Sequence, residues 1–155
     1  MMMMIVVQKM QIGTVAIAEQ GGSLTNLFFV EDTLPDQVED RASALLTEAF
    51  LQLELYLNGE LRMFSLPLAP AGTPFMQHVW RVVSEIPYGE TASYREVASA
   101  VGNPRACRAV GMANHRNPLP LFIPCHRVIG IDGSLTGYRG GLALKRQLLE
   151  MEGGV

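Results

Sequence analysis

One short segment of the chain combines residue types that could act as a nucleophile and its base. Pro124, Cys125, His126 and Arg127 follow one another inside an otherwise apolar run. A cysteine in such a run is most often an inert core residue. Basic neighbours, however, can lower a thiol pKa from about 8.5, and the thiolate is the nucleophilic form. Because Pro124 interrupts a strand, the segment predicts a reactive thiol on a turn at the floor of a pocket.

The numbers of cysteines and histidines restrict the other chemistry that this chain could perform. It has two cysteines, Cys107 and Cys125, and three histidines, His78, His115 and His126. No pair has the C-x2-C or H-x3-H spacing of a zinc site, so we expect no metal. Two thiols without an export signal are typical of a reducing compartment, and we therefore expect a cytoplasmic protein.

Composition and charge describe an ordinary globular chain with a basic second half. The 155 residues are 48% hydrophobic and 17% charged, and no apolar run approaches the roughly 20 residues that cross a bilayer. Residues 1–74 carry three basic and nine acidic side chains, whereas residues 75–155 carry nine basic and six acidic ones. Although the net charge is −3, this asymmetry indicates a second half that faces a polyanion, unless it arises by chance.

Periodicity in the first half predicts a small α/β unit. Residues 12–18 and 24–30 are apolar runs on either side of a Gly-Gly-Ser turn, which predicts a hairpin. Apolar residues then recur with a helical period from position 38 to position 57. A short strand is expected around residues 61–66. This half has no clustered His, Cys or paired carboxylates, so we expect a structural role.

The segment from Pro67 to Pro74 is the best candidate for a linker. It contains three prolines and a glycine, which are common in connections between domains. We therefore expect a structural domain over residues 1–70 and a second domain over residues 71–155.

The second half contains signals for short helices. Apolar residues on one face predict a helix over residues 75–86, with Thr73 as its N-cap. Ser93 and Glu96 have the spacing of a capping box at the start of a second helix. A third helix is expected over residues 105–114. Two short helices joined by a glycine-containing turn predict a helix-turn-helix.

The last segments complete the expected fold. Residues 121–129 form an apolar, strand-like run, and the glycine-rich residues 130–141 predict loops or a β-wing. A final helix is expected over residues 142–152. The sequence thus predicts an α/β N-terminal domain, with a small antiparallel sheet plus a helix. A mainly α, helix-turn-helix and winged-helix-like C-terminal domain should follow.

Taken in order, these motifs resemble a known family. The run Pro124-Cys125-His126-Arg127-Val128 is similar to the active-site motif of the O6-alkylguanine-DNA alkyltransferases, also called methylated-DNA–protein-cysteine methyltransferases. Further segments match in order and spacing: Ile86–Thr91, Ser93-Tyr94, Gly102–Arg105, Arg108–Gly111, Asn117-Pro118, Gly133–Tyr138 and Gly140–Leu142. The matches cover about residues 74–152, and the first half resembles the family's N-terminal domain only in layout.

The resemblance implies direct DNA repair by a suicide transferase that needs no cofactor. The alkyl group, typically methyl, would pass irreversibly from O6-alkylguanine in double-stranded DNA to Cys125, one group per protein. Because the lesion lies inside a duplex, the base must be flipped out, and in this family the recognition helix enters the minor groove. We expect a monomer that binds damaged DNA and neither a metal nor a membrane.

Three other functions compete with this interpretation. An alkyltransferase-like sensor would carry another residue, often tryptophan, in place of Cys125. A plain helix-turn-helix transcription regulator would need neither His126 nor Glu152. A cysteine hydrolase would need an oxyanion-binding motif, and none is recognisable in the sequence.

The resemblance also implies roles for five residues around the reacting atoms. Cys125 is the nucleophile, His126 takes its proton through a water, and Glu152 holds the other imidazole nitrogen. Tyr94 rotates a phosphate during flipping and hydrogen-bonds guanine N3. Asn117 belongs to the turn that joins the recognition helix to the cysteine. From the residues alone, a glutamate at a helix end would be only a solvated charge.

Further roles concern the DNA and the pocket. Arg108 would insert into the base stack, and small helix residues would allow a close approach to the DNA. The residues implied in DNA binding are Ser93, Tyr94, Arg105, Arg108, Ala109 and Gly111. In the pocket, Tyr138 would form a wall, the backbone N–H of Arg139 would face O6, and the Val128 carbonyl would accept from the guanine amine. Pro120 and Lys145 would complete the pocket.

Two residues depart from the family's usual pattern. His115 stands where many members have glycine; it either contacts a phosphate of the DNA or is only exposed to solvent, and we favour the second interpretation. Cys107 replaces a common alanine on the recognition helix, and we expect it to be a small filler because no base lies beside it. The first half also lacks the Cys/His set that binds structural zinc in some relatives.

Overall fold

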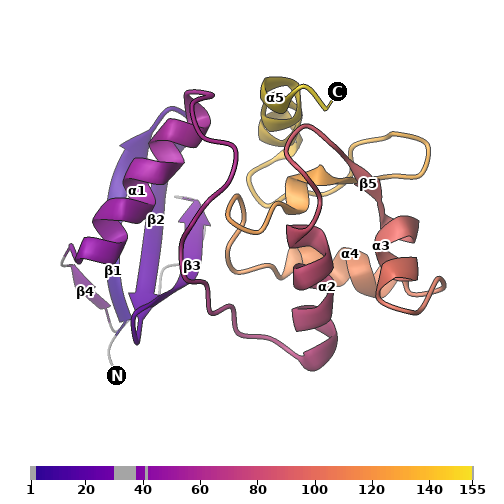
Figure 1. Ribbon diagram of the computed structural model, residues 1–155, viewed down its shortest axis with the longest axis horizontal. Helices are drawn as coiled ribbons and strands as arrows, with labels where there is room; N and C mark the ends of the chain where they lie inside the picture. Colours follow the sequence, from indigo (N-terminus) through magenta and orange to yellow (C-terminus); the bar gives the residue numbers. More distant parts are fainter. Residues whose placement is uncertain (1–2, 30–37, 41, 155) are drawn as a thin grey trace. The chain divides into compact units, whose positions relative to one another are not determined.

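Two units make up the described part of the chain, residues 3–29, 38–40 and 42–154 of the computed structural model (Figure 1). The division falls between Ala71 and Gly72. The N-terminal unit contains a sheet and one long helix, and the C-terminal unit is mainly helical.

A four-stranded sheet with the order β3-β2-β1-β4 forms the N-terminal unit. Its strands are β1 (Met3–Met10), β2 (Gly13–Gln20), β3 (Ser23–Phe29) and β4 (Val38–Asp40). The first three are antiparallel neighbours, which confirms the predicted hairpin, although Val30 lies outside the described residues. β4 pairs with β1 in parallel, so the sheet has a parallel edge that was not predicted. β1 was not predicted either.

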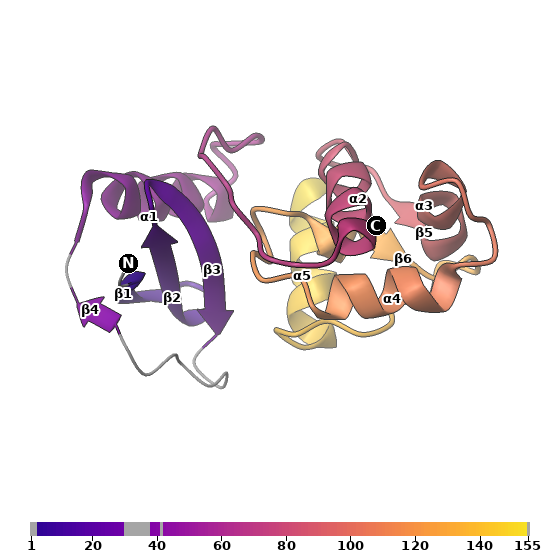
Figure 2. The ribbon, with the colours of Figure 1, turned by 90° about the horizontal axis from the view of Figure 1, so that it is seen from below.

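Helix α1 (Ala44–Leu57) lies across one face of this sheet (Figure 2). The start expected at position 38 is wrong, because Val38 belongs to β4. The helix begins after Ser43, whose Oγ accepts a hydrogen bond from the Leu46 N–H at 3.0 Å. A serine at this position satisfies one of the helix's unpaired first N–H groups and so defines where the helix starts.

The strand expected at residues 61–66 is also wrong, because these residues, all described, form none. The side chain of Gln52 accepts from the Ser65 N–H at 3.0 Å and donates to the Ser65 Oγ at 3.1 Å. Further on, the Leu24 N–H donates to the Pro67 carbonyl at 2.8 Å. The backbone of this segment is therefore hydrogen-bonded by a side chain and followed by one isolated β-bridge, and it does not form regular strand pairing.

Short helices and one small sheet form the C-terminal unit. Its elements are α2 (Pro74–Ser84), β5 (Ala92–Ser93), α3 (Tyr94–Ala100), α4 (Cys107–His115), the 3-10 helix η1 (Cys125–Arg127), β6 (Val128–Ile129) and α5 (Leu142–Glu152). β5 and β6 pair in parallel. The final helix has the predicted bounds.

The two predicted helix starts are confirmed by their caps. Thr73 Oγ1 accepts from the Met76 N–H at 3.2 Å, with Pro74 in the first turn of α2. Ser93 and Glu96 form the reciprocal capping box of α3. α4 begins two residues later than expected, because Asn103 Oδ1 holds the Arg105 N–H in a turn before the helix.

The helix-turn-helix is made by α3 and α4, and α2 packs against both (Figure 2). The Trp80 Nε1–H of α2 donates to the Ala113 carbonyl of α4 at 2.9 Å. Val83, Val97 and Val110 are fully or almost fully buried, one from each helix. This core determines which face of α4 points away from the unit's interior.

The strand expected over residues 121–129 is largely wrong. Only Val128–Ile129 pair with β5, and the residues before them form a tight turn followed by η1. Leu121 has a φ of 77°, a left-handed conformation that costs a residue with a Cβ atom about 1–2 kcal/mol. The following residues 130–141, all described, form loops and no β-wing.

Candidate active site

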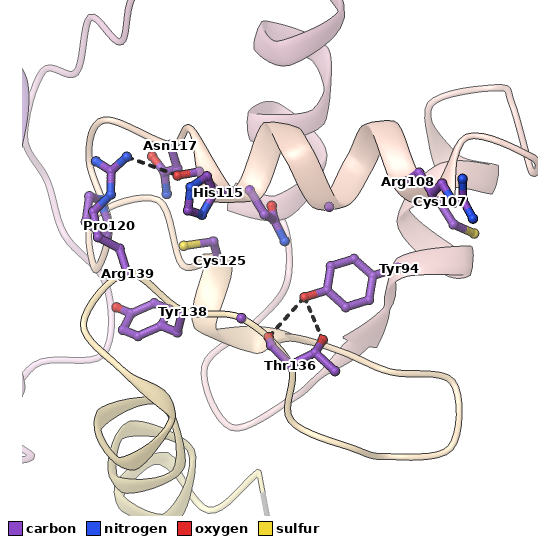
Figure 3. Close-up of a pocket in the computed structure, with 13 residues that line it drawn as sticks. Tyr94, Cys107, Arg108, His115, Asn117, Pro120, Cys125, Thr136, Tyr138 and Arg139 are labelled. Carbon is purple, nitrogen blue, oxygen red and sulfur yellow. Dashed lines mark hydrogen bonds between the residues drawn. The ribbon is translucent and has the colours of Figure 1, made fainter.

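A pocket of about 360 Å³ runs along α4 in the C-terminal unit (Figure 3). Cys107 and Arg108 lie at one end of it and Cys125 at the other. The pocket brings together eight residues predicted for the site: Tyr94, Arg108, Gly111, Asn117, Pro120, Cys125, Tyr138 and Arg139. Both residues that depart from the family pattern, Cys107 and His115, line it as well. Asn114, Thr136 and Gly137 also line it; Thr136 and Gly137 belong to the matching segment Gly133–Tyr138, but no role was predicted for any of the three.

Cys125 opens η1 and is 6% exposed. Burial raises the pKa of its thiol, and the Asn117 side chain and the Lys145 and Arg139 charges offset this only in part. The expectation that the neighbouring basic residues would lower this pKa is therefore wrong. The Arg127 guanidinium instead hydrogen-bonds Glu152. A thiol with a raised pKa needs a proton acceptor before it can attack.

A buried acceptor lies next in the chain. The His126 ring is fully buried, and its Nε2 lies 2.9 Å from Glu152 Oε2. Burial lowers the pKa of His126, and the Glu152 carboxylate offsets this only in part. The imidazole is therefore neutral near pH 7 and can take a proton.

The Glu152 carboxylate has a second partner that sequence reasoning had not identified. Arg127 donates from Nε to Oε1 at 2.8 Å and from Nη2 to Oε2 at 3.0 Å. Its Nη1 donates to the Ile86 carbonyl at 2.7 Å, which ties the end of α5 to the segment after α2. The only hint in the sequence was that a buried arginine must find an acceptor. Glu152, expected from the residues alone to be a solvated charge, is buried at the centre of this cluster.

The neutral, buried state of His126 predicts how stability depends on pH. The unfolded chain takes up a proton near the ordinary pKa of 6.5, whereas the folded chain resists it. The unfolded state therefore binds more protons below pH 6.5, and the free energy of unfolding falls as the pH falls toward the lower, folded pKa.

This decrease is measurable by denaturant unfolding from pH 7.5 to 5, followed by the fluorescence of Trp80, the chain's single tryptophan. His126→Asn should flatten the pH dependence, and the exposed His78→Gln should leave it as in the wild type. An equal slope in His126→Asn and the wild type would contradict the assignment.

Asn117 fixes the turn that precedes Cys125. Its Nδ2 donates to the Ile123 carbonyl at 3.0 Å, and its Oδ1 accepts from the Leu119 N–H at 2.9 Å. The Cys125 N–H then donates to the same Ile123 carbonyl at 2.7 Å. A buried side chain thus fixes the turn that contains the strained Leu121.

Lys145 lies behind the pocket and is fully buried, unlike the surface charge that composition alone would suggest. Burial lowers its pKa to about 8. Its Nζ donates to the Val128 carbonyl at 2.7 Å and to the Thr136 carbonyl at 2.8 Å. The Val128 carbonyl, expected to accept from a guanine amine, therefore already accepts from Lys145.

The residues predicted to contact DNA differ in exposure. Arg105, Arg108 and Ala109 are exposed along the turn before α4 and its first residues. Ser93 is buried, and its hydroxyl accepts from the Glu96 N–H as the cap of α3. Any contact of Ser93 with DNA would therefore compete with its role as a cap.

The described part of the chain contains neither a candidate metal site nor a candidate membrane-spanning helix. Within residues 3–29, 38–40 and 42–154, no group of three or more His, Cys, Asp or Glu side chains is placed to hold a metal ion. None of the helices in this part of the chain is both long and apolar enough to span a bilayer.

Fold and site together define a helix-turn-helix protein with a buried thiol in a pocket along α4, the second helix of that motif. Residues 74–154 match the DNA-binding domain of the 6-O-methylguanine DNA methyltransferases, and residues 4–70 match the ribonuclease-like domain of the same proteins. The chain therefore belongs to the 6-O-methylguanine DNA methyltransferase family. The match to residues 4–70 extends the likeness to the first half, where the sequence motifs had indicated layout alone.

Individual relatives are similar over nearly the whole chain. The methylated-DNA–protein-cysteine methyltransferase of Methanosarcina barkeri is 47% identical over 146 residues, which are 91% of each chain. The constitutive enzyme of that name from Bacillus subtilis is 47% identical over 148 residues, covering 91% of this chain and 90% of its own. The crystal structure of Mycobacterium tuberculosis OGT in complex with DNA superposes with a TM-score of 0.91 at 44% identity, covering 97% of this chain and 92% of that one.

Proposed function

We propose that this protein repairs DNA by moving the alkyl group of O6-alkylguanine, typically methyl, onto Cys125. The observation that carries the proposal is a buried thiol on the floor of a pocket beside a helix-turn-helix, followed directly by a neutral histidine that contacts a buried carboxylate. The relatives named for this activity support it. No cofactor is required.

The proposed reaction is a single nucleophilic displacement at the alkyl carbon. The Cys125 thiol passes its proton to His126 Nδ1 through a water, and Glu152 stabilises the resulting imidazolium. The thiolate sulfur then attacks the alkyl carbon, and the bond from that carbon to O6 breaks. Its electron pair stays with the base, which takes up a proton and becomes guanine. Because the new S–C bond is a stable thioether, each molecule reacts once.

Tyr94 and Asn117 assist this step in the proposal. The Tyr94 hydroxyl donates to the Thr136 carbonyl at 3.2 Å and accepts from the Thr136 Oγ1 at 3.1 Å. A guanine N3 could take the place of the carbonyl as the acceptor of its proton. Asn117 holds the turn beneath the thiol and lowers the thiol pKa by hydrogen bonding.

Double-stranded DNA is the proposed partner, bound in its minor groove along α4. Arg108 is exposed and lines the end of the pocket opposite Cys125, so its side chain could fill the stack while the flipped base occupies the pocket (Figure 3). The excess of basic side chains in residues 75–155 favours such a partner. We further propose that residues 1–70 form a structural support, and that the protein acts as a cytoplasmic monomer.

The proposal is tested by the intact mass of the protein after incubation with a duplex that carries one O6-methylguanine. We expect a gain of one methyl group per chain and no further gain with excess DNA. Repeated turnover would contradict the suicide mechanism. Binding without a change in mass would instead favour a lesion sensor.

Arg108→Ala should slow transfer from duplex DNA far more than transfer from the free base. The Arg108 side chain would act as a wedge that offsets a few kcal/mol of the cost of unstacking the flipped base. Without it, we expect the transfer rate with the duplex to decrease roughly 10- to 100-fold. The rate with free O6-methylguanine should stay near that of the wild type. The matched control is Arg146→Ala, an exposed arginine on α5. Equal slowing with both substrates would show that Arg108 is not a wedge.

A further inference from the structure

A hydrogen bond joins the two sides of the pocket beside Cys125. The Arg139 Nη2 donates to the His115 carbonyl at 3.1 Å, and Cys125 lies close to this bridge (Figure 3). His115 is the last residue of α4, and the final carbonyls of a helix have no partner within it. A guanidinium at this end of a helix is also favoured by the helix dipole. The bridge thus ties the loop 130–141 to the end of α4.

The same loop is also held at Thr136. The Tyr94 hydroxyl and the Lys145 Nζ both donate to the Thr136 carbonyl, at 3.2 and 2.8 Å. Only Gly137 and Tyr138 lie between this point and Arg139. The Tyr138 ring also makes an edge contact with the His126 ring, at a centroid distance of 6.4 Å. Residues 136–139, which form the pocket wall beside the thiol, are therefore fixed at both ends. Only the Arg139 end depends on a single exposed hydrogen bond.

We propose that the Arg139–His115 bridge determines the size of the alkyl group that the pocket accepts, an inference that rests on the proposed function. The pocket volume of about 360 Å³ lies near the lower end of the range of about 300–1,000 Å³ for ligand pockets. A flipped nucleotide must share that space with its alkyl group. With the bridge closed, a methyl group fits against the thiol, whereas a benzyl group requires Tyr138 and Arg139 to move outward.

The test measures rates of alkyl transfer from one duplex that carries either O6-methylguanine or O6-benzylguanine at the same position. Arg139→Ala should raise the benzyl rate relative to the methyl rate by about 5-fold, the equivalent of one net hydrogen bond. Losing the Arg139 charge should also slow both reactions, since that charge lowers the pKa of Cys125. The ratio of the two rates separates pocket size from this electrostatic effect and from DNA affinity.

Arg116→Ala is the matched control, because Arg116 is exposed at the same helix end and does not line the pocket. Its ratio should equal that of the wild type. An unchanged ratio in Arg139→Ala, or the same increase in Arg116→Ala, would overturn the size filter. Arg139→Met, which keeps an unbranched apolar stem but cannot donate, should behave like Arg139→Ala, and a wild-type ratio there would also overturn the size filter. If the wild type takes up no alkyl group from either duplex, the proposed function itself fails.

Discussion

Cys125→Ser should abolish transfer of the methyl group while leaving the fold and the binding of damaged DNA intact. A serine hydroxyl differs from the thiol by one atom, so it fits the same buried site. The alkylated O6 is a poor electrophile, however, and His126 cannot generate an alkoxide that replaces the thiolate near neutral pH. Intact mass should show no gain after prolonged incubation with the methylated duplex. Binding, measured by fluorescence anisotropy, should persist.

Cys107→Ser is the matched control for this experiment, because Cys107 is the chain's other thiol and lines the same pocket. It lies at the start of α4, with its Sγ near the Pro104 carbonyl at 3.8 Å. This variant should still gain one methyl group per chain, and peptide mapping should place that group on Cys125. A methyl group found on the Cys125→Ser protein would make Cys107, or another residue, the acceptor.

Glu152→Gln should cause the second large loss, in both stability and rate. The carboxylate accepts from His126 and twice from Arg127, and its side chain is fully buried. Removing its charge leaves a buried guanidinium without compensation, which costs about 3–5 kcal/mol of unfolding free energy. The imidazolium formed during transfer also loses its stabilising charge, and we expect the rate to fall by about 100-fold or more. Denaturant unfolding and single-turnover transfer measure the two effects.

A second substitution separates the two losses. In Arg127→Met combined with Glu152→Gln, the uncompensated charge is gone, so part of the stability should return. The rate should stay low, because His126 still lacks its carboxylate. The control is Glu150→Gln, two residues earlier on α5 and exposed, which should behave as the wild type in both assays. A double variant that regains the transfer rate would contradict the role of Glu152 beside His126.

The parts of the fold that the sequence predicted correctly depend on short-range interactions. Thr73 caps α2, Ser93 and Glu96 cap α3, and α5 has the predicted bounds. For the two caps, the signal and its effect lie within one helical turn, so no distant residue has to be known. Where a distant partner decides the structure, the predictions were wrong. β4 is held by β1 and not by its own periodicity, and the 61–66 segment is held by Gln52.

The same distinction between local signals and distant partners applies to the candidate site. The motif around Cys125 and the spacing of Tyr94, Asn117 and Tyr138 already predicted a thiol in a pocket, because residue types and their order are properties of the chain. Only the tertiary structure decided the protonation states. Burial raises the pKa of Cys125 and lowers that of His126, and burial depends on packing from all sides.

The tertiary structure also decided how the charged residues pair. Arg127 reaches Glu152 across 25 positions of sequence and Ile86 across 41, and Arg139 reaches the end of α4 across 24. No local pattern encodes such pairs, because each depends on how α5, the loop 130–141 and the segment after α2 fold onto η1 and α4. The sequence alone therefore predicted the nucleophile and the residues around it. The protonation states of Cys125 and His126, and the bond between Arg139 and the end of α4, follow from long-range packing.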